Sequence, residues 1–210
     1  MPTSLLISRR ALLASAAFAL VASAMPGVAM ALEEETLLGV DIPDSFTGNV
    51  DAPVTIIEYW SPTCGYCTTF LNETYPRLKS DYLDTGKARL AIRPFVRNAL
   101  DAVVFLVAEV AGRDRAPVVV EYFMRNQERW INTEDRLAAM KEVAAEAGIT
   151  PLLFESALLN REMLNRLNLM RKQAIEVFGI QGTPAVFVNG TLLPGAANYD
   201  SIAAQIASTP

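Results

Sequence analysis

The segment 60–67 (WSPTCGYC) constrains this chain more than any other, because it contains the only two cysteines among the 210 residues. The run before it, residues 54–60, is rich in β-branched and aromatic side chains and predicts a buried strand. The residues after it, 68–75, carry apolar side chains at helical spacing. Cys64 is therefore expected near the start of a helix, where unpaired backbone N–H groups favour a thiolate. This position is typical of a redox site.

The alternative for a Cys-x-x-Cys pair is half of a zinc or iron–sulfur site. Such a site needs two more soft ligands, and the sequence contains no other cysteine and no histidine. Completion by carboxylates or by a second chain is uncommon for structural zinc. A Cys-x-x-Cys inside a strand–helix pattern is instead a recognised redox motif. We therefore expect a thiol–disulfide pair, with no metal and no other cofactor.

Residues 1–31 have the pattern of a cleavable export signal. Arg9 and Arg10 form a basic start, residues 11–24 are apolar, and Ala29-Met30-Ala31 fits a small-residue cleavage site. The apolar run is too short to span a bilayer, which needs about 20 residues. The arginine pair also resembles the twin-arginine export motif, so both the general and the twin-arginine routes stay open.

The charge that remains after cleavage restricts the possible partners. Removal of residues 1–31 leaves 179 residues, enough for one sizeable hydrophobic core. Two of the 18 basic residues are lost with the signal, so the 23 acidic residues give a net charge near −7. This charge argues against nucleic acid and anionic membrane surfaces as partners.

The start of the mature chain predicts a lead-in and then a strand–helix–strand unit. Residues 32–53 are acidic and turn-rich, too short for an independent domain, with room for one short strand. Residues 54–97 contain a strand, a helix over 65–83 that includes Pro76, and a second strand over 87–95. Two strands joined in this way form a parallel pair with a right-handed crossover.

The rest of the chain divides into a helical block and a closing unit. Residues 98–172 are almost wholly helical, with helix N-caps expected at Thr133 and Asn160. Residues 173–210 contain Asn189-Gly190, the strongest short signal for a hairpin, followed by a final helix. Together these parts predict an α/β fold, a mixed four-stranded sheet with helices on its faces.

Three segments resemble the DsbA-like branch of the thioredoxin superfamily. They are residues 48–56 (GNVDAPVTI), the Cys-Gly-Tyr-Cys turn, and residues 179–190 (GIQGTPAVFVNG). Members of this branch are bacterial periplasmic thiol:disulfide oxidoreductases with a helical domain inserted between two halves of a thioredoxin fold. The resemblance covers essentially the whole mature chain. It implies that residues 98–172 are this inserted domain and that the protein is periplasmic.

The resemblance also implies roles for individual residues. Cys64 matches the exposed cysteine that exchanges with substrates, and Cys67 matches the buried one that resolves the mixed disulfide. Pro184 matches a cis-proline facing the disulfide, which frees the backbone of Thr183 to pair with an extended substrate segment. Glu58 matches a buried acid that shuttles the Cys67 proton through water. An edge-exposed carboxylate is the alternative for Glu58.

The dipeptide between the cysteines departs from DsbA itself. DsbA has Pro-His there, and its imidazole helps stabilise the thiolate, whereas this chain has Gly65-Tyr66 and no histidine. The dipeptide helps to set the thiolate pKa and the redox potential. We therefore expect the pKa of Cys64 to lie below the free value of about 8.5 and well above the value of about 3.5 in DsbA.

Thiol–disulfide exchange can run in either direction, and the sequence favours disulfide donation. Gly65-Tyr66 before a Thr-Pro loop is also the combination of DsbC-type isomerases, but these dimerise through an N-terminal domain that 22 residues cannot supply. The expected substrates are unfolded or partly folded exported proteins with cysteines, and a membrane redox partner would recycle the pair. An isomerase, a reductase and a non-catalytic binder of unfolded chains remain the alternatives.

Overall fold

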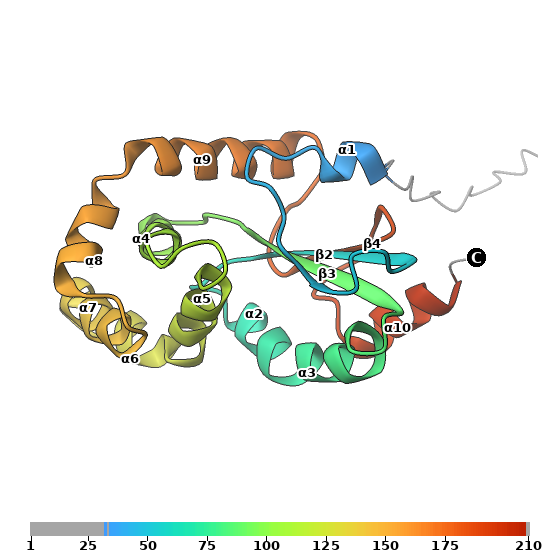
Figure 1. Cartoon of the computed structure of the whole chain (residues 1–210), viewed down its shortest axis with the longest axis horizontal. Helices are drawn as coiled ribbons and strands as arrows, with labels where there is room; N and C mark the ends of the chain where they lie inside the picture. Colours follow the sequence, from blue (N-terminus) through green and yellow to red (C-terminus); the bar gives the residue numbers. More distant parts are fainter. Residues whose placement is uncertain (1–31, 33, 209–210) are drawn as a thin grey trace, which may run out of the picture.

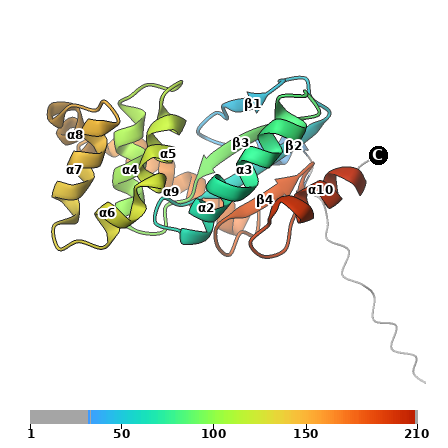
Figure 2. The same cartoon turned by 90° about the horizontal axis from the view of Figure 1, so that it is seen from below.

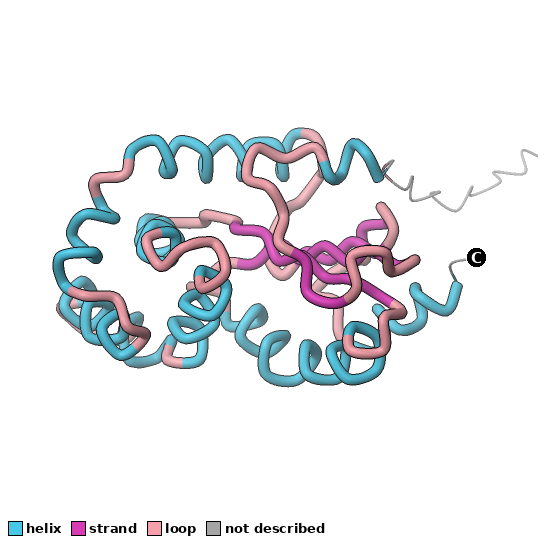
Figure 3. Tube along the Cα trace, viewed as in Figure 1, coloured by secondary structure: helices cyan, strands magenta, loops and turns pink. Residues whose placement is uncertain are grey.

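The computed structural model describes residue 32 and residues 34–208, so the expected export signal, 1–31, lies outside the described residues. Figure 1 shows a sheet with helices on both faces and a group of helices beyond one end of the strands. Figure 3 shows the same division, since the strands gather in one half of the molecule and the other half is helical. No helix in the described part of the chain is long and apolar enough to cross a membrane.

The sheet has five strands, so the expectation of four is wrong. The strands are β1 (Phe46–Gly48), β2 (Val54–Trp60), β3 (Ala88–Pro94), β4 (Ala185–Val188) and β5 (Thr191–Leu192). Their order is β1-β3-β2-β4-β5, in which only β2 and β3 are parallel. The extra strand is β1, a three-residue piece of the lead-in at the sheet edge. It ends at a glycine because a Cβ on Gly48 would lie 2.6 Å from the carbonyl oxygen of Ala88.

All seven residues of β2 are buried, because helices cover both faces of the sheet. Successive side chains of a strand point to opposite faces. Ile56 accordingly packs in a cluster with Phe70 and Ile202, whereas Ile57 packs in a separate cluster with Met170. A continuous apolar run is what such a two-sided strand requires.

The connection from β2 to β3 is one helical segment over residues 65–83, as predicted, but two of its turns are π-helical. It consists of α2 (Gly65–Thr69), η1 (Phe70–Thr74), α3 (Tyr75–Leu78) and η2 (Lys79–Leu83). Pro76 lacks a backbone N–H, and its ring crowds the preceding turn. The wider turn before α3 accommodates the proline, so the segment continues instead of ending. Figure 2 shows α2 and α3 following one another along the sheet.

The helical block packs around a hydrophobic core of its own. Its helices are α4 (Ala99–Glu109), α5 (Ala116–Arg125), α6 (Gln127–Ile131), α7 (Arg136–Glu146), α8 (Pro151–Leu158) and α9 (Arg161–Glu176). The expected cap at Thr133 is wrong, because Asp135 is the N-cap of α7 and accepts a hydrogen bond from the N–H of Ala138. Asn160 caps α9 as predicted, accepting from the N–H of Met163.

Helix α9 joins the helical block to the sheet. Its first half contributes Met163 and Leu167 to the core of the helical block. Its second half contributes Met170 and Ala174 to the hydrophobic cluster that contains Ile57 of β2. The boundary expected at residue 172 therefore falls inside one helix that belongs to both hydrophobic cores.

The C-terminal hairpin is confirmed. Asn189 and Gly190 turn between β4 and β5 with positive φ angles of 43° and 78°, as a tight hairpin turn requires. The side chain of Asn189 accepts from the N–H of Thr55 at 2.7 Å, and its own N–H donates to the Thr55 carbonyl at 2.9 Å. The final helix, α10 (Tyr199–Ser208), then packs against β4.

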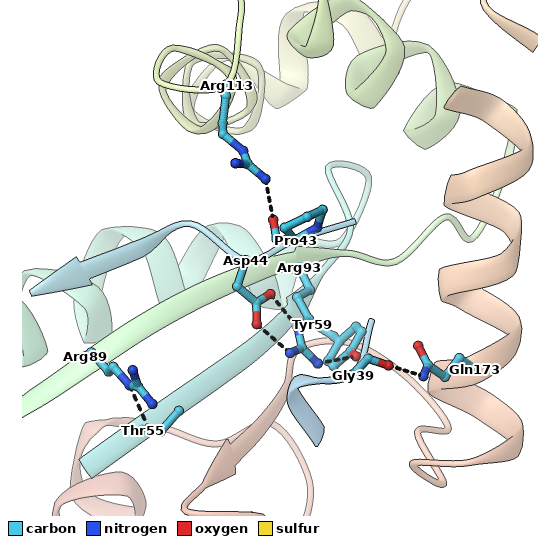
Figure 4. A network of polar contacts seen from close by, with 9 residues as sticks. All are labelled: Gly39, Pro43, Asp44, Thr55, Tyr59, Arg89, Arg93, Arg113 and Gln173. Atoms are coloured by element: carbon cyan, nitrogen blue, oxygen red, sulfur yellow. Dashed lines mark hydrogen bonds and ion pairs between the residues drawn. The ribbon is translucent and has the colours of Figure 1, made fainter. Parts of the chain in front are cut away.

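Polar contacts hold the lead-in across the sheet and α9, as Figure 4 shows. After α1 (Glu34–Leu38), the carbonyl of Gly39 accepts from the side chain of Gln173 at 2.7 Å. Arg93 donates to the two carboxylate oxygens of Asp44 at 2.7 and 2.6 Å, and to the Tyr59 hydroxyl at 2.8 Å. The side chains of this ion pair are only 1% and 6% exposed. The buried ion pair between Asp44 and Arg93 of β3 therefore fixes the lead-in to the sheet.

Replacing Asp44 tests this attachment. Asp44→Ala should lower the free energy of unfolding by about 3–5 kcal/mol, because it leaves the buried Arg93 guanidinium without its partner. The control Glu176→Ala removes an exposed ion pair with Lys172 and should change stability by less than about 0.5 kcal/mol. Urea denaturation at pH 7 measures both values, and equal stability of the two variants would contradict the structural role of Asp44.

Candidate active site

The two cysteines lie at the junction between β2 and α2, as predicted. Trp60 is the last residue of β2, and Cys64 is the N-cap of α2 with an extended backbone (φ −94°, ψ 115°). Cys67 lies within α2, and both residues are free thiols in this structure. Their side chains belong to the hydrophobic cluster of the helical block. The redox pair is thus carried by the sheet half of the molecule but packed against the helical half.

Cys64 was expected to be exposed, but the residue is almost completely buried. Only 4% of the residue is exposed, compared with 0% of Cys67. The loop before β4 lies against it, and the Cys64 thiol donates a hydrogen bond to the carbonyl oxygen of Thr183 at 3.2 Å. Cys64 is therefore the more accessible of the two residues, and the Thr183 loop lies beside it.

The surroundings of the two thiols move their pKa values in opposite directions. The hydrogen bond from Cys67 is the largest cause that lowers the pKa of Cys64 to about 5, against the opposing effect of burial. The backbone N–H of Cys67 acts in the same direction. Burial is the largest cause that raises the pKa of Cys67, followed by its hydrogen bond to Cys64. At neutral pH the pair is therefore a thiolate at Cys64 and a thiol at Cys67, and the value for Cys64 lies in the expected range.

The loop that faces Cys64 contains the predicted Thr183 and Pro184. The Thr183–Pro184 peptide bond is cis, the isomer that the resemblance led us to expect. Pro184 is buried, and the buried Thr183 hydroxyl has no hydrogen-bond partner within the described residues. The structure thus brings together Cys64, Cys67 and this loop.

Glu58 lies in the middle of the sheet, so the alternative of an edge-exposed carboxylate is wrong. On β2 it is paired with Ile92 of β3 on one side and Val186 of β4 on the other. It is fully buried, and neither carboxylate oxygen has a hydrogen-bond partner in the described part of the chain. Burial, and after it the charge of Cys64, raise the pKa of Glu58 well above its ordinary value. The side chain is thus protonated over a wide pH range.

The predicted tuning residues, Gly65 and Tyr66, face away from the sulfur atoms. A Cβ on Gly65 would meet no atom within 4 Å, and Tyr66 is 71% exposed. Within the described residues, the hydrogen bonds that lower the pKa of Cys64 come chiefly from Cys67. A tuning role of the dipeptide stays a prediction, while its exposure leaves it open to a partner molecule.

Sequence reasoning missed one residue of the site, Asp101 of α4. This carboxylate is fully buried and accepts hydrogen bonds from the hydroxyl of Ser61 and the N–H of Thr63, both at 2.9 Å. It therefore contacts the turn that leads into Cys64. The signal in the sequence was a lone carboxylate in a helix whose other residues near its start are apolar.

The described residues offer no metal site beside the cysteine pair. No group of three or more His, Cys, Asp or Glu side chains in residue 32 and residues 34–208 is placed to hold a metal ion.

Alkylation should distinguish the two thiols. In the reduced protein, the rate of Cys64 modification by iodoacetamide should rise with pH around a midpoint of about 5, because the thiolate forms above the lowered pKa. Cys67 should stay unmodified, because its raised pKa keeps it a thiol. Peptide mass mapping after short exposure at pH 6 measures the ratio, and preferential labelling of Cys67 would reverse the assignment.

Glu58 should make stability depend on pH. A carboxyl group whose pKa is raised on folding supports the folded state fully below its unfolded pKa of about 4.3, and this support is lost as the pH rises. Glu58→Gln keeps a neutral side chain at every pH. It should therefore gain stability relative to the unaltered protein between pH 5 and 8, as measured by urea denaturation, and not at pH 4. A variant that is less stable at pH 8 would show that Glu58 is ionised and paired.

Comparison with known sequences gives a family and several relatives. Residues 41–208 match the family model described as Thioredoxin. A putative protein-disulfide oxidoreductase of Rickettsia bellii is 25% identical over 152 residues, which cover 72% of this chain and 59% of that protein. The probable disulfide bond formation protein D of Bacillus cereus is 28% identical, with 69% of each chain covered. The chain thus spans about 60% of the length of the Rickettsia relatives.

Comparison with solved structures gives the same arrangement of sheet and helices. Wolbachia pipientis alpha-DsbA1 superposes with a TM-score of 0.73 at 20% identity, over 82% of this chain and 94% of the other. A structure described as a protein-disulfide isomerase from Novosphingobium aromaticivorans superposes with a TM-score of 0.70 at 26% identity, over 79% and 96%.

Proposed function

The chain belongs to the thioredoxin family with a DsbA-like fold, and from this premise we propose that it exchanges disulfides with exported proteins through Cys64 and Cys67. The observation that carries the proposal is the placement of the two cysteines, with Cys64 at the start of α2 beside the Thr183 loop and Cys67 fully buried inside the helix, and the opposite shifts of their pKa values agree with it. A low pKa makes Cys64 a good leaving group and a reactive thiolate at neutral pH, whereas the buried Cys67 thiol is protected. This asymmetry suits a pair in which one sulfur forms the mixed disulfide with the substrate and the other resolves it.

The reaction in the donating direction starts from the Cys64–Cys67 disulfide. A substrate thiolate attacks the Cys64 sulfur, which forms a mixed disulfide and releases Cys67 with the electron pair of the broken S–S bond. A second substrate thiolate then attacks the substrate sulfur and releases Cys64 as a thiolate. The substrate loses two electrons and gains a disulfide, and the enzyme pair is reduced to a thiol and a thiolate.

Glu58 supplies the proton that these reaction steps need. Cys67 leaves as a thiolate, and its raised pKa makes that form costly in the core. The carboxyl group of Glu58 is kept protonated by burial, and its charged form would interact with both sulfur atoms. A proton passes from Glu58 to Cys67 in the donating direction and returns when Cys67 attacks a mixed disulfide.

The Thr183 loop is the proposed substrate contact. Its carbonyl oxygen lies 3.2 Å from the Cys64 sulfur, so an extended segment that pairs with the Thr183 backbone would place its own cysteine beside Cys64. The exposed Tyr66 lies in α2, two residues after Cys64, and offers an apolar surface to that segment.

Donation of disulfides is the favoured direction. A stabilised thiolate favours the reduced enzyme and therefore makes its disulfide more oxidising. An isomerase is the second candidate, and the likeness to the protein described as a protein-disulfide isomerase from Novosphingobium aromaticivorans favours it. The export pattern of residues 1–31 favours the periplasm as the site of the reaction, and there a membrane redox partner would reoxidise the pair.

Two cysteine variants test the proposed function. Cys64→Ser should abolish exchange with a dithiol peptide, because the sulfur that meets the substrate is gone. With the disulfide form of the peptide, Cys67→Ala should accumulate mixed disulfides, because Cys64 attacks the peptide disulfide and Cys67 is no longer there to displace the peptide from Cys64. Non-reducing electrophoresis and mass spectrometry measure both, and a Cys64→Ser protein that keeps full activity would point to a non-catalytic binder.

A further inference from the structure

The turn between β2 and α2 is held by the helical block rather than by the sheet. The Ser61 hydroxyl lies 2.9 Å from both carboxylate oxygens of Asp101, and the Thr63 N–H donates to Asp101 at 2.9 Å. The carbonyl oxygen of Pro62 accepts from the side chain of Gln127, in α6, at 2.7 Å. All three residues that precede Cys64 are therefore bound by helices of the block.

Asp101 is the centre of this set of contacts. It also accepts from the N–H of Arg97 at 2.8 Å, and the cap of its helix, Asn98, donates to the Thr63 hydroxyl at 2.8 Å. Both Asp101 and Ser61 are fully buried. A buried carboxylate is costly unless its oxygens are hydrogen-bonded. Here three groups converge on it from two segments, so displacement of the turn would leave a buried charge unsatisfied.

The turn transmits this constraint to the active sulfur. The carbonyl oxygen of Ser61 accepts from the N–H of Cys64 at 3.0 Å, so fixing Ser61 fixes the backbone of Cys64. The thiolate is stabilised by hydrogen bonds from the side chain and the backbone N–H of Cys67, which need the Cys64 sulfur in one place at the start of α2.

We propose that Asp101 is a positioning residue through which the helical block holds the Cys64 sulfur in its thiolate-stabilising contacts. This inference rests on the proposed function and adds to it a reason why the helical block is tied to the redox turn. It also explains how a site without a histidine keeps a stabilised thiolate. A ligand or partner that moved the start of α4 would, by this route, change the reactivity of Cys64.

The sign of the effect separates positioning from a simple charge effect. The negative charge of Asp101 by itself disfavours a nearby thiolate, so its removal alone would lower the pKa of Cys64. Loss of positioning has the opposite result, because the thiolate loses its hydrogen bonds and the pKa rises. A residue that served folding only would change stability and leave the pKa of Cys64 unaltered.

The test is a titration of the Cys64 thiolate by its ultraviolet absorbance in Asp101→Asn and Ser61→Ala. The Asn side chain keeps the shape but replaces one acceptor with a donor, so it cannot satisfy all of the groups that now bind Asp101. We expect the pKa of Cys64 to rise by about one unit in Asp101→Asn, and by less in Ser61→Ala. The thiolate fraction at pH 5 would fall roughly five-fold, and the equilibrium with glutathione would shift up to about ten-fold toward the enzyme disulfide.

Asp135→Asn is the matched control. Asp135 caps α7 in the same helical block, so its replacement can change stability, but it should leave the pKa of Cys64 and the glutathione equilibrium unchanged. If Asp101→Asn does not fold, Ser61→Ala and Gln127→Ala each remove one side-chain contact to the turn and carry the same expectation.

An unchanged or lowered pKa of Cys64 in these folded variants would overturn the proposal. A shift of the same size in Asp135→Asn would overturn it as well. Failure of the proposed function would be seen separately, as an unaltered protein that does not exchange with a dithiol peptide, whatever the pKa values of the variants.

Discussion

The hydrogen bond between the two thiols is the interaction on which the chemistry of this protein depends. It lowers the pKa of Cys64 and adds to the burial that raises the pKa of Cys67, so it increases the difference in reactivity between the two sulfurs. Such a bond has this effect only if both sulfurs are withdrawn from water, which would otherwise compete for them. The 4% and 0% exposure of the two residues meets that condition. Burial by itself raises the pKa of Cys64, so the hydrogen bond lowers that pKa against the effect of burial.

The two halves of the fold contribute differently to this contact. The sheet half supplies β2, which leads into the turn that carries the cysteines and holds the buried Glu58 six residues before Cys64. The helical block supplies the apolar wall against the sulfurs and the hydrogen bonds that hold the turn before Cys64. The two halves are joined by α9, which belongs to both cores, and by the lead-in with its buried Asp44–Arg93 pair. The redox site thus lies at an interface inside one packed unit.

Local patterns in the sequence were enough for much of this architecture. The β-branched run before Cys64, the Asn189-Gly190 turn and the Asn160 cap depend on backbone preferences of neighbouring residues, and each is confirmed. Features that depend on distant contacts were predicted only in part or were missed. β1 forms because three residues happen to lie along the edge of β3, and the 4% exposure of Cys64 follows from a loop more than a hundred positions away. Asp101 was visible only as an unexplained charge in an apolar helix.

The reduction potential of the Cys64–Cys67 pair, measured against glutathione at pH 7, tests the central claim most directly. A Cys64 pKa of about 5 lies between those of thioredoxin, about 7, and DsbA, about 3.5. Because thiolate stabilisation favours the reduced form, the potential should fall between the values of about −270 mV and about −120 mV that belong to those two proteins. A potential at or below that of thioredoxin would contradict the account, since the contacts around Cys64 would then not stabilise its thiolate.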